Sequence, residues 1–351
     1  MTSPLRRAHH SVVALAAATC LTLLTACSGG GASDTVGAAT SGAAADGSGG
    51  TLNLYAFSVP KVGFDAVIPG FNATTEGKGV TFQQSYGPSG DQSRKVAAGA
   101  AADVVSFSVE PDMTRLVDAG LVSSDWNDSA HHQGVAFGSV VAIVVRKGNP
   151  KGIKTWDDLL KPGLEVVTPN PFSSGSAKWN LLAPYAAKSD GGANPAAGLD
   201  YISKLVGDHV KTQPKSGREA SDAFLQGQGD VLLSYENEAL FLERAGDPVE
   251  HMIPEQTFRI DNPVASTTKG ADVAKAKAFV DYLFTAPAQT VLAQKGFRVT
   301  DTAVAQKFAS SFPTPTKLYT IDDLGGWKKV DSTLFKKDVG TIAKIYDAAS
   351  K

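Results

Sequence analysis

Short apolar runs alternate with helical patterns along the chain after residue 50. Runs rich in β-branched and aromatic residues lie at 51–57, 80–86, 102–109, 139–148, 164–169, 229–235 and 262–268. Segments such as "AKWNLLAPYAAK" and "REASDAFLQGQ" lie between them. Near-continuous apolar strands that alternate with helices are typical of an α/β fold with mostly parallel sheets. A length of about 300 residues after the N-terminal region predicts two lobes.

In folds of this kind, ligands bind outside the carboxyl ends of the strands, beside the helix that follows. Three predicted helices begin with the dipeptide Ser-Gly. Ser89 precedes Gln92 by three residues and Ser216 precedes Glu219 by three, which are capping-box spacings. The third start, "PNPFSSGSAKWN", places Ser174 at the N-cap position.

This third start has more small polar residues than capping needs. Gly175 and Ser176 follow Ser174 and form the first helical turn. The first amides of a helix lack intrahelical partners, and its dipole favours negative charge there. Glycine lets an anion approach these amides, and serine hydroxyls add donors. A plain cap without a ligand is the alternative for any one start, but three converging starts would form a neutral anion-binding cage.

The N-terminus is typical of an exported protein. Arg6 and Arg7 precede an apolar run at 12–24, which is too short to span a bilayer. "LTAC" ends this run and resembles a lipoprotein signal, so we expect a signal peptide at 1–26 and lipidation of Cys27. An ordinary secretory signal is the alternative. Residues 27–50 are mostly Gly, Ala, Ser and Thr and are predicted to be a lipid anchor and flexible tether.

Composition excludes several classes of function. Cys20 and Cys27 are the only cysteines, so disulfides and thiolate catalysis are excluded after residue 27. The formal charge of −2 and the lack of a basic block argue against a nucleic-acid partner. No serine stands in a Gly-x-Ser-x-Gly motif, and no histidine spacing indicates a triad or a metal site. We therefore expect no enzyme activity, cofactor or metal, with a lipoprotein hydrolase as the competing class.

Four segments carry a resemblance to a known family. They are "YGPSGDQSRKV", "VVRKGNPKGIKTWDDLLKPGLEVVTPNPFSSGSAKWNLLA", "GQGDVLLSYENEA" and "LYTIDDLGGWKKV". In this order they resemble the sulfate and thiosulfate substrate-binding proteins of ABC importers, most of all the actinobacterial sulfate-binding lipoproteins. The resemblance covers essentially the whole chain after the tether.

The resemblance implies a hinged type II periplasmic-binding fold with the ligand cleft between two lobes. Lobe one is expected at 51–135 plus 262–312 and lobe two at 136–261. The segment 313–351 is expected to pack across the lobes. The protein is expected to be a monomer on the outer face of the cytoplasmic membrane. Its implied partners are sulfate, with thiosulfate as a further ligand, and an ABC permease with a cytoplasmic ATPase.

The same resemblance implies that neutral donors hold the anion. Tyr235 takes the position of a family tryptophan, so a phenol O–H replaces an indole N–H. The start at Ser216 departs from the family pattern, so Arg218 either faces the anion, faces solvent or pairs with a carboxylate. The residues expected at the anion are Ser89, Gly90, Ser174, Gly175, Ser176, Gly217, Arg218, Tyr235 and, in the first-strand loop, Ser58.

A cage made only of donors favours sulfate over hydrogen phosphate. Sulfate carries no proton at neutral pH, whereas the proton of hydrogen phosphate needs an acceptor. Asp91 could supply that acceptor, but at the second helical position we expect it to point outward. Another oxyanion such as phosphate or molybdate remains the alternative ligand. A receptor that feeds signalling instead of import is the alternative role.

Overall fold

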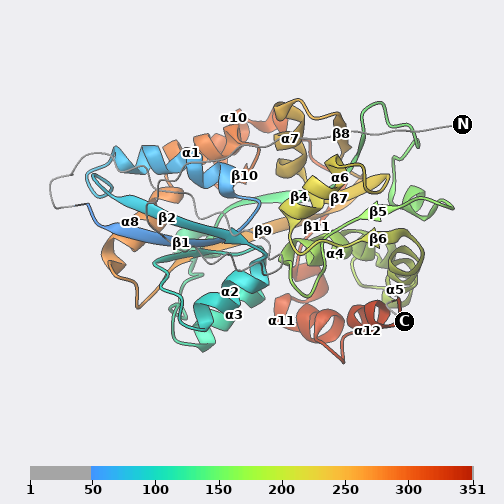
Figure 1. Cartoon of the computed structure of the whole chain (residues 1–351), viewed down its shortest axis with the longest axis horizontal. Coiled ribbons are helices and arrows are strands. Elements are labelled where there is room, and N and C mark those ends of the chain that lie inside the picture. Colours follow the sequence, from blue (N-terminus) through green and yellow to red (C-terminus); the bar gives the residue numbers. More distant parts are fainter. Residues whose placement is uncertain (1–48, 350–351) are drawn as a thin grey trace, which may run out of the picture. The chain divides into compact units, whose positions relative to one another are not determined.

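Two long strands run antiparallel through the middle of one mixed sheet in the computed structural model of the chain. The structure describes residues 49–349. The predicted signal peptide, the lipidation of Cys27 and almost all of the tether lie outside these residues. The order of paired strands is β2-β1-β3-β9-β4-β7-β5-β6, with β8 and β10 on β4 and β11 on β9 (Figure 1).

The strands are β1 (Thr51–Phe57), β2 (Thr81–Gly87), β3 (Val104–Ser106), β4 (Val135–Arg146), β5 (Val166–Val167), β6 (Val210–Thr212), β7 (Val231–Tyr235), β8 (Val249–Met252), β9 (Gln256–Ser266), β10 (Arg298–Val299) and β11 (Lys317–Tyr319). The α-helices are α1 (Lys61–Asn72), α2 (Ser89–Ala97), α3 (Glu110–Asp118), α4 (Gly175–Ser189), α5 (Pro195–Lys204), α6 (Gly217–Leu225), α7 (Glu236–Ala245), α8 (Val273–Leu283), α9 (Ala286–Gln294), α10 (Thr302–Lys307), α11 (Trp327–Val330) and α12 (Thr341–Ala349).

The prediction of an α/β fold is confirmed, and the pairing refines it. β1 pairs parallel with β2 and β3 at one end of the sheet, and β5 pairs parallel with β6 and β7 at the other. We call the end built on β1–β3 the first lobe and the end built on β5–β7 the second lobe. In Figure 1, β4 and β9 lie between these ends. Their pairing with each other and with β3 and β7 is antiparallel, so parallel pairing lies within each lobe and between β9 and β11.

The central strands make this arrangement a hinge between two lobes. β4 pairs with β9 along its first half and with β7 and β8 along its second half. One strand therefore contributes to both lobes, as the near-continuous apolar run at 139–148 allows. The boundaries 51–135, 136–261 and 262–312 remain predictions, because β4 and β9 cross from one end of the sheet to the other.

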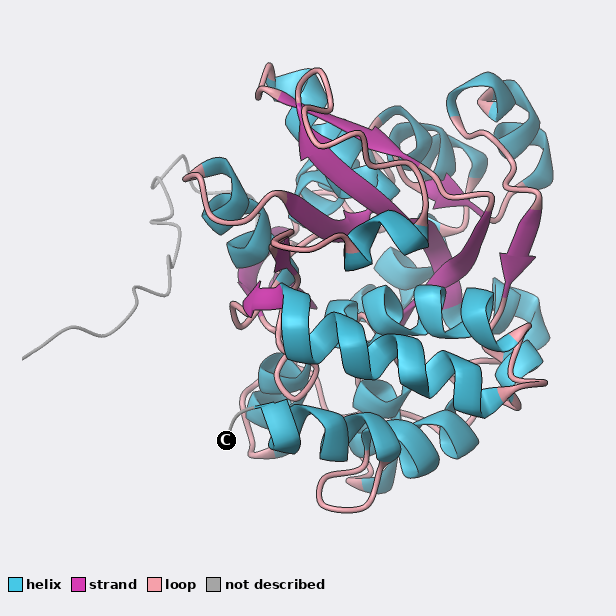
Figure 2. Cartoon of the chain, turned by 90° about the vertical axis from the view of Figure 1, so that its right-hand side faces the viewer, coloured by secondary structure: helices cyan, strands magenta, loops and turns pink. Residues whose placement is uncertain are grey.

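Each lobe has a hydrophobic core, and the core of the second lobe extends to Val59 and Val109 in the loops of the first lobe. Helices cover the faces of the strands in Figure 2. In the first lobe, α1 and α8 pack their aromatic rings together, and the ring centroids of Phe71 and Phe279 lie 5.1 Å apart. In the second lobe, Trp179 of α4 packs edge-to-face on Trp327 of α11, with centroids 4.6 Å apart.

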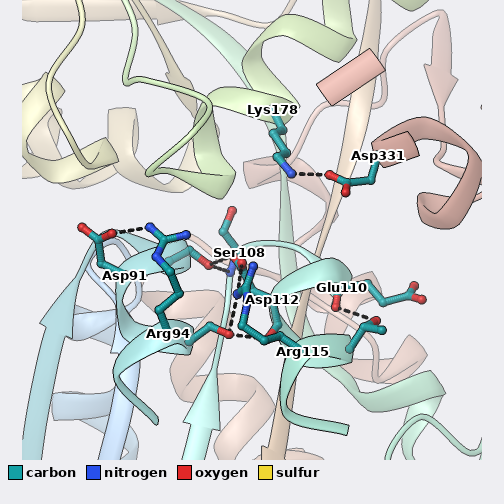
Figure 3. A network of polar contacts seen from close by, with 11 residues as sticks. Asp91, Arg94, Ser108, Glu110, Asp112, Arg115, Lys178 and Asp331 are labelled. Carbon is teal, nitrogen blue, oxygen red and sulfur yellow. Dashed lines mark hydrogen bonds and ion pairs between the residues drawn. The ribbon is translucent and has the colours of Figure 1, made fainter. Parts of the chain in front are cut away.

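The C-terminal segment packs on both lobes. β11 pairs with the beginning of β9, and α12 contacts α5 in the second lobe. α11 contacts α3, which belongs to the first lobe. Lys178 of α4 and Asp331 form an ion pair (Figure 3). Within residues 49–349, no helix has the length and apolar character to cross a membrane.

Candidate anion-binding site

The start of α4 has the donors that the sequence predicts. Ser174 is the N-cap residue, with φ −110° and ψ 121°, but its side chain makes no capping hydrogen bond. It is only 2% exposed. The first amides of α4, beginning with Gly175 and Ser176, have no intrahelical partners. A buried hydroxyl and backbone N–H groups therefore remain as donors for a ligand.

The start of α6 is capped as predicted. Ser216 is the N-cap residue and accepts a hydrogen bond of 3.2 Å from the backbone N–H of Glu219. The carboxylate of Glu219 accepts from the backbone N–H of Lys215 at 3.1 Å. The Ser216 hydroxyl therefore serves the helix, and the amides of Gly217 and Arg218 are the groups that this start presents.

At α2, the predicted capping role of Ser89 is wrong. The helix begins at Ser89 itself, and the residue before it is Pro88. The Ser89 hydroxyl donates to the carboxylate of Asp112 at 2.7 Å and accepts from the backbone N–H of Ser108 at 2.9 Å. A buried carboxylate is a stronger acceptor than a backbone group, and it takes the hydroxyl's one proton. What Ser89 retains for an anion is its backbone N–H.

The starts of α4 and α6, in the second lobe, pack closely against the first lobe. A Cβ placed on Gly175 would lie 2.7 Å from Cβ and 2.8 Å from Oγ of Ser108, which follows β3 in the first lobe. A Cβ on Gly217 would lie 3.1 Å from the side chain of Val59, which follows β1. These glycines are needed for space, because the loops after β1 and β3 approach the second-lobe helices closely.

The start of α2, in the first lobe, contacts the second lobe through its backbone. The N–H of Gly90 donates to the carbonyl of Ser173 at 3.1 Å, and a Cβ on Gly90 would lie 3.1 Å from that oxygen. Ser173 directly precedes the N-cap of α4. The starts of α2, α4 and α6 thus converge between the lobes, as the sequence predicts for a shared anion cage.

Tyr235, the last residue of β7, lies beside the same convergence of helix starts. It is 1% exposed, and its hydroxyl lies 2.7 Å from the hydroxyl of Ser108. Burial raises the pKa of the phenol well above its ordinary value and outweighs the neighbouring polar side chains of Ser108, Ser176 and Asn262, which lower it. Tyr235 therefore keeps its proton at neutral pH and can act as a hydrogen-bond donor.

Sequence reasoning missed Ser108 and Asp112. Ser108 follows β3, at the end of the run predicted at 102–109, so its place at the carboxyl end of a strand was the available signal. Asp112 lies in α3 and forms an ion pair of 2.9 Å with Arg115 (Figure 3). Its second oxygen accepts from the Ser89 hydroxyl, so this carboxylate is already paired on both oxygens.

Three arginines near the helix starts, Arg94, Arg115 and Arg218, are paired with carboxylates. Arg218 forms an ion pair of 3.0 Å with buried Glu238, which is one of the alternatives that the sequence left open. Its guanidinium also lies 4.3 Å from the ring centroid of Phe241. Burial raises the pKa of Glu238, and the charge of Arg218 opposes this shift. Arg218 therefore contributes structure to α6, while its backbone N–H remains beside the convergence point.

Asp91 points toward its own helix. It forms an ion pair with Arg94 one turn later, and its side chain is 37% exposed (Figure 3). An exposed, paired carboxylate is a poor acceptor for a buried protonated anion. Ser58, in the loop after β1, is half-buried, and its contact with an anion remains a prediction.

Comparisons with known proteins place the chain among transport receptors. The family "Bacterial extracellular solute-binding protein" matches residues 52–298. A sulfate-binding protein of Synechococcus elongatus is 36% identical over 98% of each chain. A thiosulfate-binding protein of Pseudomonas aeruginosa is 34% identical over 77% of this chain and 84% of its own.

Solved structures agree with this placement. The sulfate-binding protein SubI from Mycobacterium tuberculosis H37Rv is 58% identical, with a TM-score of 0.80, over 82% of this chain and 99% of its own. The periplasmic binding protein P5PA is 20% identical, with a TM-score of 0.63, over 80% of this chain and 96% of its own, and shows the shared fold.

Proposed function

Because the chain belongs to the bacterial extracellular solute-binding proteins, and among them to the sulfate- and thiosulfate-binding proteins, we propose that it captures sulfate and delivers it to an ABC importer. The observation that carries this proposal is that the starts of α2, α4 and α6, which come from both lobes, converge around Ser174. Their free donors are backbone amides and neutral hydroxyls.

We further propose the contacts within the cage. Ser174 donates through its hydroxyl, and Gly175 and Ser176 donate through their amides. The first lobe donates through the backbone N–H groups of Ser89 and Gly90, once the Gly90 N–H leaves the Ser173 carbonyl.

The remaining proposed donors complete the cage. The backbone at Gly217 and Arg218 donates from α6. The Tyr235 O–H donates from β7, and Ser58 lies at the rim on the loop after β1.

The selectivity follows from the charges that surround these donors. Arg94, Arg115 and Arg218 each pair with a carboxylate, so the cage itself is neutral. Asp112 is the buried carboxylate beside the site, and both of its oxygens are occupied. A hydrogen phosphate would leave its proton without an acceptor, at a cost of about 1–3 kcal/mol. The proposed ligand is therefore sulfate, with thiosulfate as a related dianion.

The proposed cellular role is inferred from the family to which the chain belongs. We propose a monomeric receptor that is anchored through Cys27 on the outer face of the cytoplasmic membrane. The closed form would dock on a transmembrane permease driven by a cytoplasmic ATPase. Closure is a population shift, because only the closed form offers donors from both lobes to one anion. No catalytic step is proposed.

Calorimetric titration tests the ligand. The protein from Gly50 onward is titrated with sulfate, thiosulfate, phosphate and molybdate at pH 5.5 and pH 8. We expect tight sulfate binding that is independent of pH and that Ser174→Ala weakens by about tenfold or more. A preference for phosphate that Asp91→Asn abolishes would mean that Asp91 turns inward and that the anion is phosphate. An absence of binding to all four anions would refute the receptor function.

A further inference from the structure

Ser108 makes hydrogen bonds with both lobes at once. It is fully buried and follows β3 in the first lobe. Its backbone N–H donates to the Ser89 hydroxyl in the same lobe at 2.9 Å. Its carbonyl accepts from the side-chain amide of Asn262 on the central strand β9 at 3.2 Å. The residue is therefore fixed to the first lobe and to the hinge.

Its other contacts cross to the second lobe. The indole N–H of Trp179, on α4, donates to the Ser108 carbonyl at 2.7 Å. The Ser108 hydroxyl lies 2.7 Å from the hydroxyl of Tyr235 at the end of β7. Trp179 and Tyr235 are both almost fully buried. These bonds join the lobes directly and need no bound anion between them.

The hydroxyl pair also controls where a proton points. Two hydroxyls bring two protons, and the bond between them uses one. When Ser108 donates to the phenol oxygen, the proton of Tyr235 is free to point elsewhere. A hydrogen bond accepted by the phenol oxygen also strengthens its own O–H as a donor. The start of α4 lies against this hydroxyl pair, because a Cβ on Gly175 would be 2.8 Å from the Ser108 hydroxyl oxygen.

We propose that Ser108 is a positioning residue whose hydroxyl latches the closed lobes through Tyr235 and turns the Tyr235 O–H toward the bound anion. The second part rests on the proposed function, whereas the latch does not. A closed form held by its own hydrogen bonds is populated before the anion arrives. The anion then loses less of its binding free energy to closure.

Nearby Ser106 offers a matched control. It is fully buried on β3, two residues before Ser108, and its hydroxyl has no hydrogen-bond partner among the described residues. Ser106→Ala therefore removes a buried hydroxyl oxygen two residues away from Ser108 without touching the latch. The experiment compares Ser108→Ala, Tyr235→Phe and their double variant with Ser106→Ala, all in the full-length chain.

Two measurements are made on each variant. Hydrogen–deuterium exchange without ligand reports amide protection over 104–113 and 170–180, on the two sides of the latch. Stopped-flow dissociation reports how fast sulfate leaves. In Ser108→Ala and Tyr235→Phe we expect faster exchange in both segments and sulfate release about tenfold faster, as expected for the loss of one buried hydrogen bond. The double variant should be no worse than Tyr235→Phe, since Tyr235→Phe already lacks the hydroxyl bond that Ser108→Ala removes.

The outcomes separate the latch from the proposed function. The latch would be overturned if amide exchange and sulfate release were as slow in Ser108→Ala as in Ser106→Ala. It would also be overturned if the effects of Ser108→Ala and Tyr235→Phe added up in the double variant. If the wild-type chain bound no sulfate, the proposed function would fail. Ligand-free exchange would still decide whether Ser108 holds the lobes together.

Discussion

A single methyl group at Gly175 should keep the lobes from closing. In the structure, a Cβ at this position would lie 2.7 Å from Cβ and 2.8 Å from Oγ of Ser108. Optimal contacts between carbon atoms are about 3.5–4.0 Å, so the overlap is close to 1 Å. Neither atom is the end of a long flexible side chain. Relief must come from separation of α4 and the loop after β3.

The magnitude follows from the cost of overpacking. An added methyl group in a packed site costs about 1–3 kcal/mol. Ser108 belongs to the opposite lobe, so this cost falls on the closed form and spares an open one. Only the closed form binds the anion from both lobes, and the affinity for sulfate should fall by about 5- to 150-fold. The free energy of unfolding without ligand should change by less than about 0.5 kcal/mol.

Calorimetry with sulfate and thermal unfolding without sulfate are the two assays for Gly175→Ala. Gly207→Ala is the matched control, because a Cβ at Gly207 would meet no atom within 4 Å and the residue lies in a helical segment. An unchanged sulfate affinity in Gly175→Ala would refute the idea that α4 closes on Ser108. An equal loss of thermal stability in both variants would assign the effect to the helices and not to closure.

Three further predictions concern donors and ion pairs. Ser174→Ala should weaken sulfate binding by about tenfold or more without loss of stability, because this hydroxyl caps no amide. A lower unfolding temperature in the ligand-free Ser174→Ala variant would contradict that. Arg298 binds buried Glu236 through two hydrogen bonds of 2.6 and 2.9 Å, so Arg298→Leu should lower the free energy of unfolding by about 3–5 kcal/mol in urea unfolding. An unchanged urea midpoint would show that the carboxylate finds another partner. Lys161 and the backbone amides around the N-cap hold the pKa of Asp158 below its ordinary value, so its stabilising effect exists above about pH 4 and is lost as the pH falls further. Asp158→Asn should therefore cost about 1 kcal/mol at pH 7 and progressively less below pH 4, and exposed Asp157→Asn serves as the control; a pH-independent difference would argue against this assignment.

Local patterns in the sequence predicted many of the elements well. The run at 51–57 is β1, and the run at 229–235 contains β7. "TWDDLL" is a short 3-10 helix at Trp156–Leu160 that Asp158 caps. The short strands β6, β8, β10 and β11 were missed, since two to four residues show no clear period. The mostly parallel pairing was only partly right, because β4 and β9 turn antiparallel through the hinge.

The sequence by itself determined the α/β class and the three helix starts with their donors. These features depend on residues close together in the chain, whose periodicity and capping chemistry act locally. Tertiary structure decided the partners across the site. Ser89 donates to Asp112 instead of capping its helix, Arg218 pairs with Glu238, and Ser108 reaches Tyr235. Each of these contacts depends on the packing of one lobe against the other or of one helix on the next. A hydroxyl or a guanidinium binds the strongest acceptor that this packing brings within reach, and no local pattern encodes that distance.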